Sequence, residues 1–175
     1  MEFIRDYAMY AAIFGFFGTV WFGWAQERPP KSWHLPLAVG SIVSGMLTFG
    51  GLYLAATNWS GASALNSRDD YITFGMVVAV EFALAGIGAG ILAARKKPVY
   101  IPAWIAFVVG VHFLPLAWIF QDTALYVLTV LAVLAPIVSV PLAKKTGIAL
   151  SAIVGAGMGI VLVGFALRGL ILALI

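Results

Sequence analysis

Two side chains with acid–base chemistry interrupt the middle of two long apolar stretches of this sequence. Glu81 lies in one stretch and His112 in the next, and a basic turn at residues 95–98 separates them. A carboxylic acid beside an imidazole can hold one proton and exchange it near neutral pH. An ionisable group inside a bilayer costs about 2.5 kcal/mol or more, so such groups usually face protein or water and have a role. The two residues therefore mark a candidate site.

The spacing of Glu81 and His112 from the turn places both residues at the same depth. Glu81 lies fifteen residues before Lys96, and His112 lies fifteen residues after Lys97. If both stretches are α-helices that rise about 1.5 Å per residue, both side chains lie roughly 22 Å from the turn. The pattern does not establish that the two helix faces meet.

The elements that must position these residues are helices that span a membrane. Of the 175 residues, 63% are hydrophobic and 10% are charged, whereas a soluble domain has about 25% charged residues. Six apolar stretches reach the roughly 20 residues that a spanning helix needs: they lie at 7–26, 34–57, 72–94, 99–120, 123–143 and 146–170. Backbone groups in hydrocarbon need internal partners, so the stretches should be helical. We expect an all-α polytopic membrane protein, a single transmembrane domain over residues 1–175 with six transmembrane helices.

The basic residues predict how the chain is oriented in the membrane. The loops after the first, third and fifth stretches hold seven Lys and Arg residues, and the opposite side holds Arg5, Arg68 and Arg168. By the positive-inside rule, both termini are extracytoplasmic and the three basic loops are cytoplasmic. Arg168 should then extend to the outer interface. Alternatively, it pairs with Asp122 or with Glu81.

Three further residues extend the candidate site into a polar pocket that opens to the outside. Thr48, like Glu81 and His112, lies about nine residues from the outer end of its stretch. Pro115 has no N–H group, so it cannot donate to the carbonyl group of Val111, next to the imidazole. Freed carbonyl groups at membrane depth bond to side chains or water, or coordinate a ligand. We expect Glu81, His112, Thr48, Val111 and Pro115 to form a binding site.

Three interpretations of Glu81 and His112 remain open. They form a hydrogen bond that holds two helices together, or a pair that accepts a proton or binds a substrate, or part of a metal or haem site. Zinc takes three or four protein ligands, and this depth offers one Glu and one His. A second haem ligand would have to be His34, at the opposite end of its stretch. We expect no metal, no cofactor and no catalytic set of residues.

Small and aromatic residues predict how the helices pack. Small residues let membrane helices approach closely, and the third and sixth stretches carry the pairs Gly86/Gly90 and Gly155/Gly159. We expect both pairs to lie at helix contacts. Three aromatic residues of the first stretch share one helical face, which faces lipid or lines a groove for a lipid or quinone: Phe14, Phe17 and Trp21.

Two segments resemble parts of small, uncharacterised bacterial multi-pass membrane proteins. They are residues 22–27 (FGWAQE), followed by Pro29 and Pro30, and residues 109–117 (VGVHFLPLA). The similarity covers most of the chain. This family has no known activity, so the resemblance implies a location in the bacterial inner (plasma) membrane and no particular substrate.

Three functions are compatible with these patterns. The leading hypothesis is a protein that transports or binds a small molecule, ion or lipid at the Glu81–His112 pocket. The second is an accessory or scaffold subunit of a larger membrane complex, because the loops are short. As protein partners we consider a second copy of the chain or another membrane subunit. An intramembrane enzyme acting on lipid is the third, although a nucleophile and an oxyanion donor are not evident. The immediate partner is the lipid bilayer, and the basic residues form no stripe that would bind nucleic acid.

Overall fold

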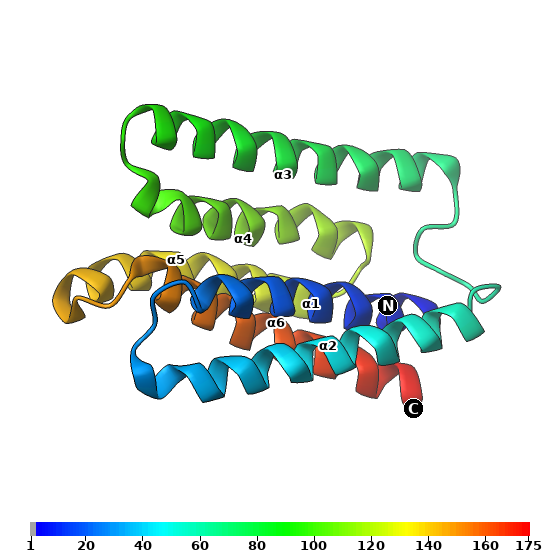
Figure 1. The fold of residues 1–175 in the computed structure, drawn as a ribbon. Coiled ribbons are helices and arrows are strands. Elements are labelled where there is room, and N and C mark those ends of the chain that lie inside the picture. The colour runs from blue at the N-terminus through cyan, green and yellow to red at the C-terminus, as the bar shows by residue number, and fades with distance from the viewer. Residues whose placement is uncertain (1–2) are drawn as a thin grey trace. The chain divides into compact units, whose positions relative to one another are not determined.

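The structure is a computed structural model that describes residues 3–175. Its described part is all-helical and contains no strand (Figure 1). The long helices are α1 (Ile4–Ala25), α2 (His34–Thr57), α3 (Arg68–Ala94), α4 (Ile101–Ile119), α5 (Ala124–Thr146) and α6 (Leu150–Leu174), and two short 3-10 helices are η1 (Lys31–Trp33) and η2 (Pro98–Tyr100). All six long helices are long and apolar enough to cross a membrane. The prediction of an all-α fold with six helices of spanning length is confirmed.

Helix boundaries agree with the predicted spans to within a few residues, and the differences have local causes. The second span is reproduced at both ends. α3 begins four residues earlier than predicted, because Ser67 and Asp70 form a capping box in which each side chain accepts a hydrogen bond from the other residue's backbone. Such a reciprocal cap satisfies two N–H groups at a helix start. α5 continues through the basic residues to Thr146 and ends at Gly147, whose φ of 71° is left-handed.

The helices gather in two compact units. One unit contains the described residues up to Ala64 together with Gly155–Ile175, and the other is Leu65–Val154. Thus α1, α2 and most of α6 belong to the first unit, and α3, α4 and α5 belong to the second. The Glu81–His112 pair lies entirely within the second unit, so its geometry is set by α3 and α4.

In the first unit, α1 packs closely against both α2 and α6. A Cβ atom added at Gly15 would lie 2.8 Å from Thr48 of α2, and one at Gly155 of α6 would lie 2.6 Å from the carbonyl oxygen of Trp21. Gly159 of α6 likewise lies against Phe22 of α1. The predicted helix contact at the second glycine pair is therefore confirmed.

The aromatic stripe of α1 differs from its prediction. Phe14 and Trp21 are 6% and 4% exposed, whereas Phe17 is 40% exposed. Of the two alternatives, a stripe that faces lipid is wrong for the two buried rings, and a groove for a lipid or quinone stays a prediction. α1 is covered by helices on two sides, so aromatic residues on neighbouring positions of one face divide between core and surface.

In the second unit, α4 packs against α3 and α5, and α3 contacts only α4 among these three helices. Figure 1 shows α3 and α4 side by side, joined by a short turn. No residue of α3 is buried. A Cβ atom at Gly86 or Gly90 would meet nothing within 4 Å, whereas one at Gly88 would overlap the Trp104 ring. The prediction that Gly86 and Gly90 lie at a helix contact is wrong, because the contact face runs through Gly88.

The α3–α4 turn ends α3 with a left-handed residue that is not glycine. Lys96 has a φ of 57°, and the N–H group of Lys97 donates to the carbonyl oxygen of Leu92 at 2.8 Å. This bond is the one that closes a Schellman motif. The tight turn brings the chain straight back into α4, so residues equally distant from the turn come together.

Candidate functional site

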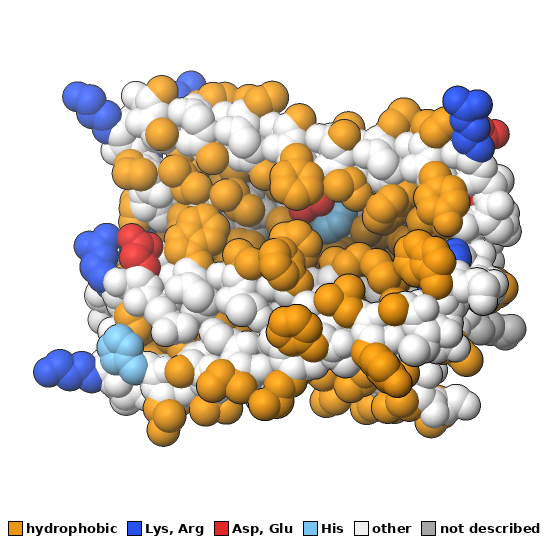
Figure 2. Space-filling view, turned by 45° about the vertical axis from the view of Figure 1, so that its right-hand side comes forward, with side chains coloured by type: hydrophobic (Ala, Val, Ile, Leu, Met, Phe, Trp, Pro, Cys, Tyr) orange, Lys and Arg blue, Asp and Glu red, His pale blue; other side chains and the backbone are white. Residues whose placement is uncertain are grey.

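Glu81 of α3 and His112 of α4 face one another. Nε2 of His112 lies 3.5 Å from Oε2 of Glu81, and the side chains are 13% and 14% exposed. Figure 2 shows Lys and Arg side chains at the ends of the helices and hydrophobic side chains along their length, with an acidic and a histidine side chain next to each other among the latter. The sequence did not establish that these two helix faces meet, and in the structure they do.

The pair belongs to a consistent register along the α3–α4 hairpin. Farther from the turn, the rings of Phe74 and Phe120 pack edge to face with centroids 5.9 Å apart. Closer to the turn, Gly88 lies against Trp104. Contacts on both sides therefore hold Glu81 and His112 at the level that counting from the turn predicts.

Trp104 is a positioning residue that the sequence did not indicate. Its indole N–H group donates a hydrogen bond to the carbonyl oxygen of Leu84 at 3.1 Å, across the two helices. Leu84 lies one turn after Glu81 on α3. Gly88 makes room for the indole, since a side chain there would occupy the same space. A tryptophan in a membrane helix is ordinarily assigned to the interface, and no sequence signal distinguishes this contact role.

The imidazole of His112 is held by its own helix as well as by Glu81. Nδ1 lies 2.6 Å from the carbonyl oxygen of Val109, one turn earlier in α4. The ring also packs at 4.3 Å against that of Phe113, which is 3% exposed. Nδ1 contacts a backbone carbonyl oxygen and Nε2 faces the carboxyl group of Glu81, so both ring nitrogens have a defined partner.

The structure brings together only part of the predicted pocket. Pro115 lies inside α4, so its ring withholds an N–H group from the carbonyl of Val111 as predicted. The carbonyl that contacts the imidazole is, however, that of Val109. The Val111 side chain is 40% exposed. A role of Val111 in binding stays a prediction.

Thr48 belongs to the first unit, where its contacts are with α1 and its own helix. Its hydroxyl group donates to the carbonyl oxygen of Ser44 at 2.9 Å. Gly15 of α1 approaches both residues closely. Thr48 therefore lies at the contact between α2 and α1, and its participation in the site stays a prediction.

The donor atoms at the pair suit a proton better than a multivalent metal ion. Within residues 3–175, no three His, Asp or Glu side chains gather where they could hold a metal ion. One carboxyl group and one imidazole provide two donors, fewer than the three or four protein ligands that zinc takes. The arrangement can share, accept and release a proton.

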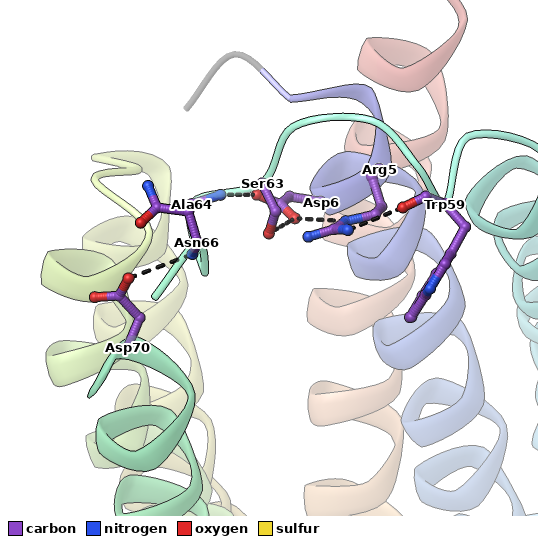
Figure 3. A network of polar contacts seen from close by, with 7 residues as sticks. All are labelled: Arg5, Asp6, Trp59, Ser63, Ala64, Asn66 and Asp70. Carbon is purple, nitrogen blue, oxygen red and sulfur yellow. Dashed lines mark hydrogen bonds and ion pairs between the residues drawn. The ribbon is translucent and has the colours of Figure 1, made fainter. Parts of the chain in front are cut away.

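A second polar cluster lies at the start of α1, and Figure 3 shows its residues. The carboxylate of Asp6, 5% exposed, accepts hydrogen bonds from the hydroxyl group of Ser63 at 2.7 Å and from the N–H group of Ala64 at 2.6 Å. Arg5 donates to the carbonyl oxygen of Trp59 at 2.9 Å and lies over its ring. These contacts fasten the loop after α2 to the start of α1, so the cluster is structural.

Arg168, on the last helix, lies near the start of α1. Its guanidinium carbon is 5.6 Å from the centre of the Tyr7 ring, a distance typical of a cation–π interaction. Tyr7 belongs to the first turn of α1 and lies at the end of the helix where the Asp6 cluster sits. The extension of Arg168 to an outer interface stays a prediction.

Comparison with known proteins places the chain in a family without assigning an activity. No curated protein and no solved structure matches the sequence. Residues 61–168, which include all of α3, α4 and α5 and therefore the Glu81–His112 pair, match a family of unknown function. The predicted resemblance to an uncharacterised family is confirmed. Because the match covers more than half of the sequence, the chain belongs to the family of unknown function DUF7010.

Proposed function

We propose that this chain is a small transport or binding protein of the bacterial inner membrane, with Glu81 and His112 as its polar centre. The observation that carries the proposal is the contact at 3.5 Å between two ionisable groups from different apolar helices. Such groups are costly inside a membrane and commonly mark substrate, ion or proton pathways. The ligand is a small molecule, an ion or a lipid that reaches the pair from the outside.

The charge distribution supports the proposed orientation. The turn between α3 and α4 carries Arg95, Lys96 and Lys97, whereas Asp69 and Asp70 lie at the opposite end of α3. The positive-inside rule places the basic turn in the cytoplasm and the start of α3 outside. In this orientation both termini are extracytoplasmic.

Flux measurements in proteoliposomes test the proposal. The purified chain is reconstituted with a pH-sensitive dye inside, and proton movement is followed under an imposed pH gradient, with and without Na⁺ or K⁺. Proton flux above that of protein-free vesicles should be lost in the Glu81→Gln/His112→Ala double variant. Flux that persists unchanged in this variant, or that never exceeds the protein-free level with any of the three ions, contradicts transport of these ions through the pair.

The chain supplies matched controls for both substitutions. Glu27 and His34 are exposed residues outside the second unit. A Glu27→Gln/His34→Ala variant makes the same chemical changes away from the pair and should retain the flux. Loss of flux in this control as well would attribute the effect to the general consequences of substitution.

An accessory subunit is the second candidate, and the exposure of α3 favours it. This helix has no buried residue, and Gly75, Gly86 and Gly90 have open space in front of them. Small residues on a free helix face allow close approach of another membrane helix. Purification in mild detergent followed by mass determination tests this function. A stable complex with another membrane protein supports it, and a lone chain or a simple homo-oligomer argues against it.

A further inference from the structure

We infer that Glu81 and His112 together bind one shared proton between Oε2 and Nε2, in a geometry set by the carbonyl group of Val109. The inference deepens the proposed function, on which it rests, by naming the ligand of the pair as the proton. It follows from the two contacts of the imidazole ring, from the charge of each protonation state, and from the positions of the other charged groups.

The contact with Val109 determines which ring nitrogen carries a hydrogen. A carbonyl oxygen accepts hydrogen bonds and cannot donate them. Because Nδ1 lies 2.6 Å from the carbonyl oxygen of Val109, Nδ1 must be the donor. In the neutral ring the other nitrogen then has a lone pair. This lone pair is the one that faces Glu81.

The number of protons between the facing atoms Oε2 and Nε2 determines the charge of the pair. Without it, the Glu81 carboxylate would point at the lone pair of Nε2, and two electron-rich atoms would lie 3.5 Å apart. With one proton, either the carboxylic acid donates to Nε2 or the imidazolium donates to the carboxylate, and in both cases the pair is neutral. With two protons, an imidazolium faces a neutral acid and the pair carries a positive charge.

The surroundings favour the neutral state of the pair. A net charge among apolar groups is disfavoured unless another charge compensates it. The other charged or titratable groups of α3, α4, α5 and their connections lie at or near the helix ends, where they are Arg68, Asp69, Asp70, Tyr71, Arg95, Lys96, Lys97, Tyr100, Asp122, Tyr126, Lys144 and Lys145. Glu81 and His112 must therefore compensate each other's charge, and a single bound proton makes the pair neutral.

Exchange of this proton involves no other chemical change. A proton from water adds to Nε2 or Oε2 of the empty pair, and the same bond breaks when the proton returns to water. Between these events the proton is carried by either Nε2 or Oε2, which lie 3.5 Å apart. Release of the proton leaves a carboxylate beside a lone pair, which is an unfavourable state. The pair then binds another proton from water on whichever side of the membrane water can reach it. A centre of this kind loads and unloads one positive charge at a time.

Nitrogen NMR of the ring tests the inference without reference to flux. The chain contains two histidines, so His34→Gln with labelled histidine leaves one imidazole to observe, in lipid vesicles. The chemical shifts should show a hydrogen on Nδ1 throughout the neutral pH range, whether or not Nε2 carries the shared proton. A neutral ring with its hydrogen on Nε2 and a bare Nδ1 would overturn the assignment, because Val109 could not then accept a hydrogen bond.

A second variant reports on the proton itself. Glu81→Gln keeps the shape of the side chain but has no acidic proton, and its amide N–H group can still donate to Nε2. In this variant the Nε2 signal should be that of an unprotonated nitrogen, while the Nδ1 signal stays that of N–H. In the unsubstituted protein, either Nε2 should carry a hydrogen or the carboxyl carbon of Glu81 should give the signal of a protonated acid. An unprotonated Nε2 together with the signal of a Glu81 carboxylate would refute a shared proton, and Glu27→Gln should leave both signals unchanged. If the spectra show the expected signals but the vesicles show no flux, the inference of a shared proton stands and the transport proposal fails.

Discussion

A methyl group added at Gly88 should destabilise the α3–α4 hairpin, whereas one added at Gly86 should not. The two glycines lie two residues apart on α3, but only Gly88 faces α4. A Cβ atom at Gly88 would overlap the ring of Trp104, and one at Gly86 would meet nothing within 4 Å. Gly88→Ala therefore forces the indole away from α3 and breaks its hydrogen bond to the carbonyl group of Leu84.

The expected effect combines three terms. Forcing an extra methyl group into a packed contact costs about 1–3 kcal/mol. A hydrogen bond between membrane helices contributes about 0.6 kcal/mol on average. Replacing glycine by alanine inside a helix gains up to about 1 kcal/mol, and this gain is common to both variants. We expect Gly88→Ala to be less stable than Gly86→Ala by about 1.6–3.6 kcal/mol, the sum of the first two terms.

Reversible unfolding in mixed micelles measures this difference. The free energy of unfolding is obtained for both variants by titration with sodium dodecyl sulfate, and helical circular dichroism follows the transition. Trp104→Phe keeps most of the ring volume and removes the N–H group, so it isolates the hydrogen-bond term. Equal stability of Gly88→Ala and Gly86→Ala would refute the packing described for this hairpin and the register that joins Glu81 to His112.

Three further variants probe the remaining features of the fold. Gly51→Ala should lower the free energy of unfolding by about 1–3 kcal/mol, because its methyl group would meet the backbone of α1. Gly45 on the same helix has open space in front of it, so Gly45→Ala should not lower the free energy of unfolding. Equal values for the two variants would contradict the α1–α2 contact. Asp6→Ala should cost about 1–3 kcal/mol, because it removes the carboxylate that accepts hydrogen bonds from the Ser63 hydroxyl group and the Ala64 N–H group. It should also speed amide exchange in this loop. Asp69 is exposed, so Asp69→Ala should change stability by at most about 1 kcal/mol. Lys96→Gly should stabilise the protein by about 1 kcal/mol in the same titration, because φ is 57° at this position, and a loss of stability would argue against the left-handed turn.

The fold was largely predictable because the bilayer restricts the choices. Continuous apolar stretches of about 20 residues leave helices as the solution that pairs every backbone group, and six such helices are present. The depth of Glu81 and His112 was predictable for a related reason. A short turn with Lys96 at its centre reverses the chain, so counting residues on each side gives the register.

Contacts between helices were harder to predict, since composition does not determine which face a helix buries. Gly86/Gly90 and Gly155/Gly159 have the same spacing, yet one pair faces open space and the other meets α1. The difference depends on the neighbour, because α3 packs on a single helix of its unit whereas α6 packs against α1. The contact of Trp104 with Leu84 joins residues on two helices, and no local pattern indicates it.

The candidate site was predictable in its ionisable residues and less so in its backbone. An acid and a base in the middle of apolar stretches are conspicuous in the sequence. Pro115 directed attention to the carbonyl group of Val111, but the imidazole bonds to Val109, because the rotation of a histidine side chain decides which carbonyl it reaches. Thr48 has the right depth, but its hydroxyl group bonds to its own helix.

The way the first unit draws on both ends of the described chain has a consequence for biogenesis. α1 and α2 are synthesised first, whereas α6, which completes their unit, is synthesised after α3, α4 and α5. Until α6 is made, the surfaces of Trp21 and Ala25 that it covers lack their partner. The contiguous second unit can assemble during this interval. Ribosome-bound intermediates arrested before α6 should therefore contain the Glu81–His112 contact but an incomplete first unit.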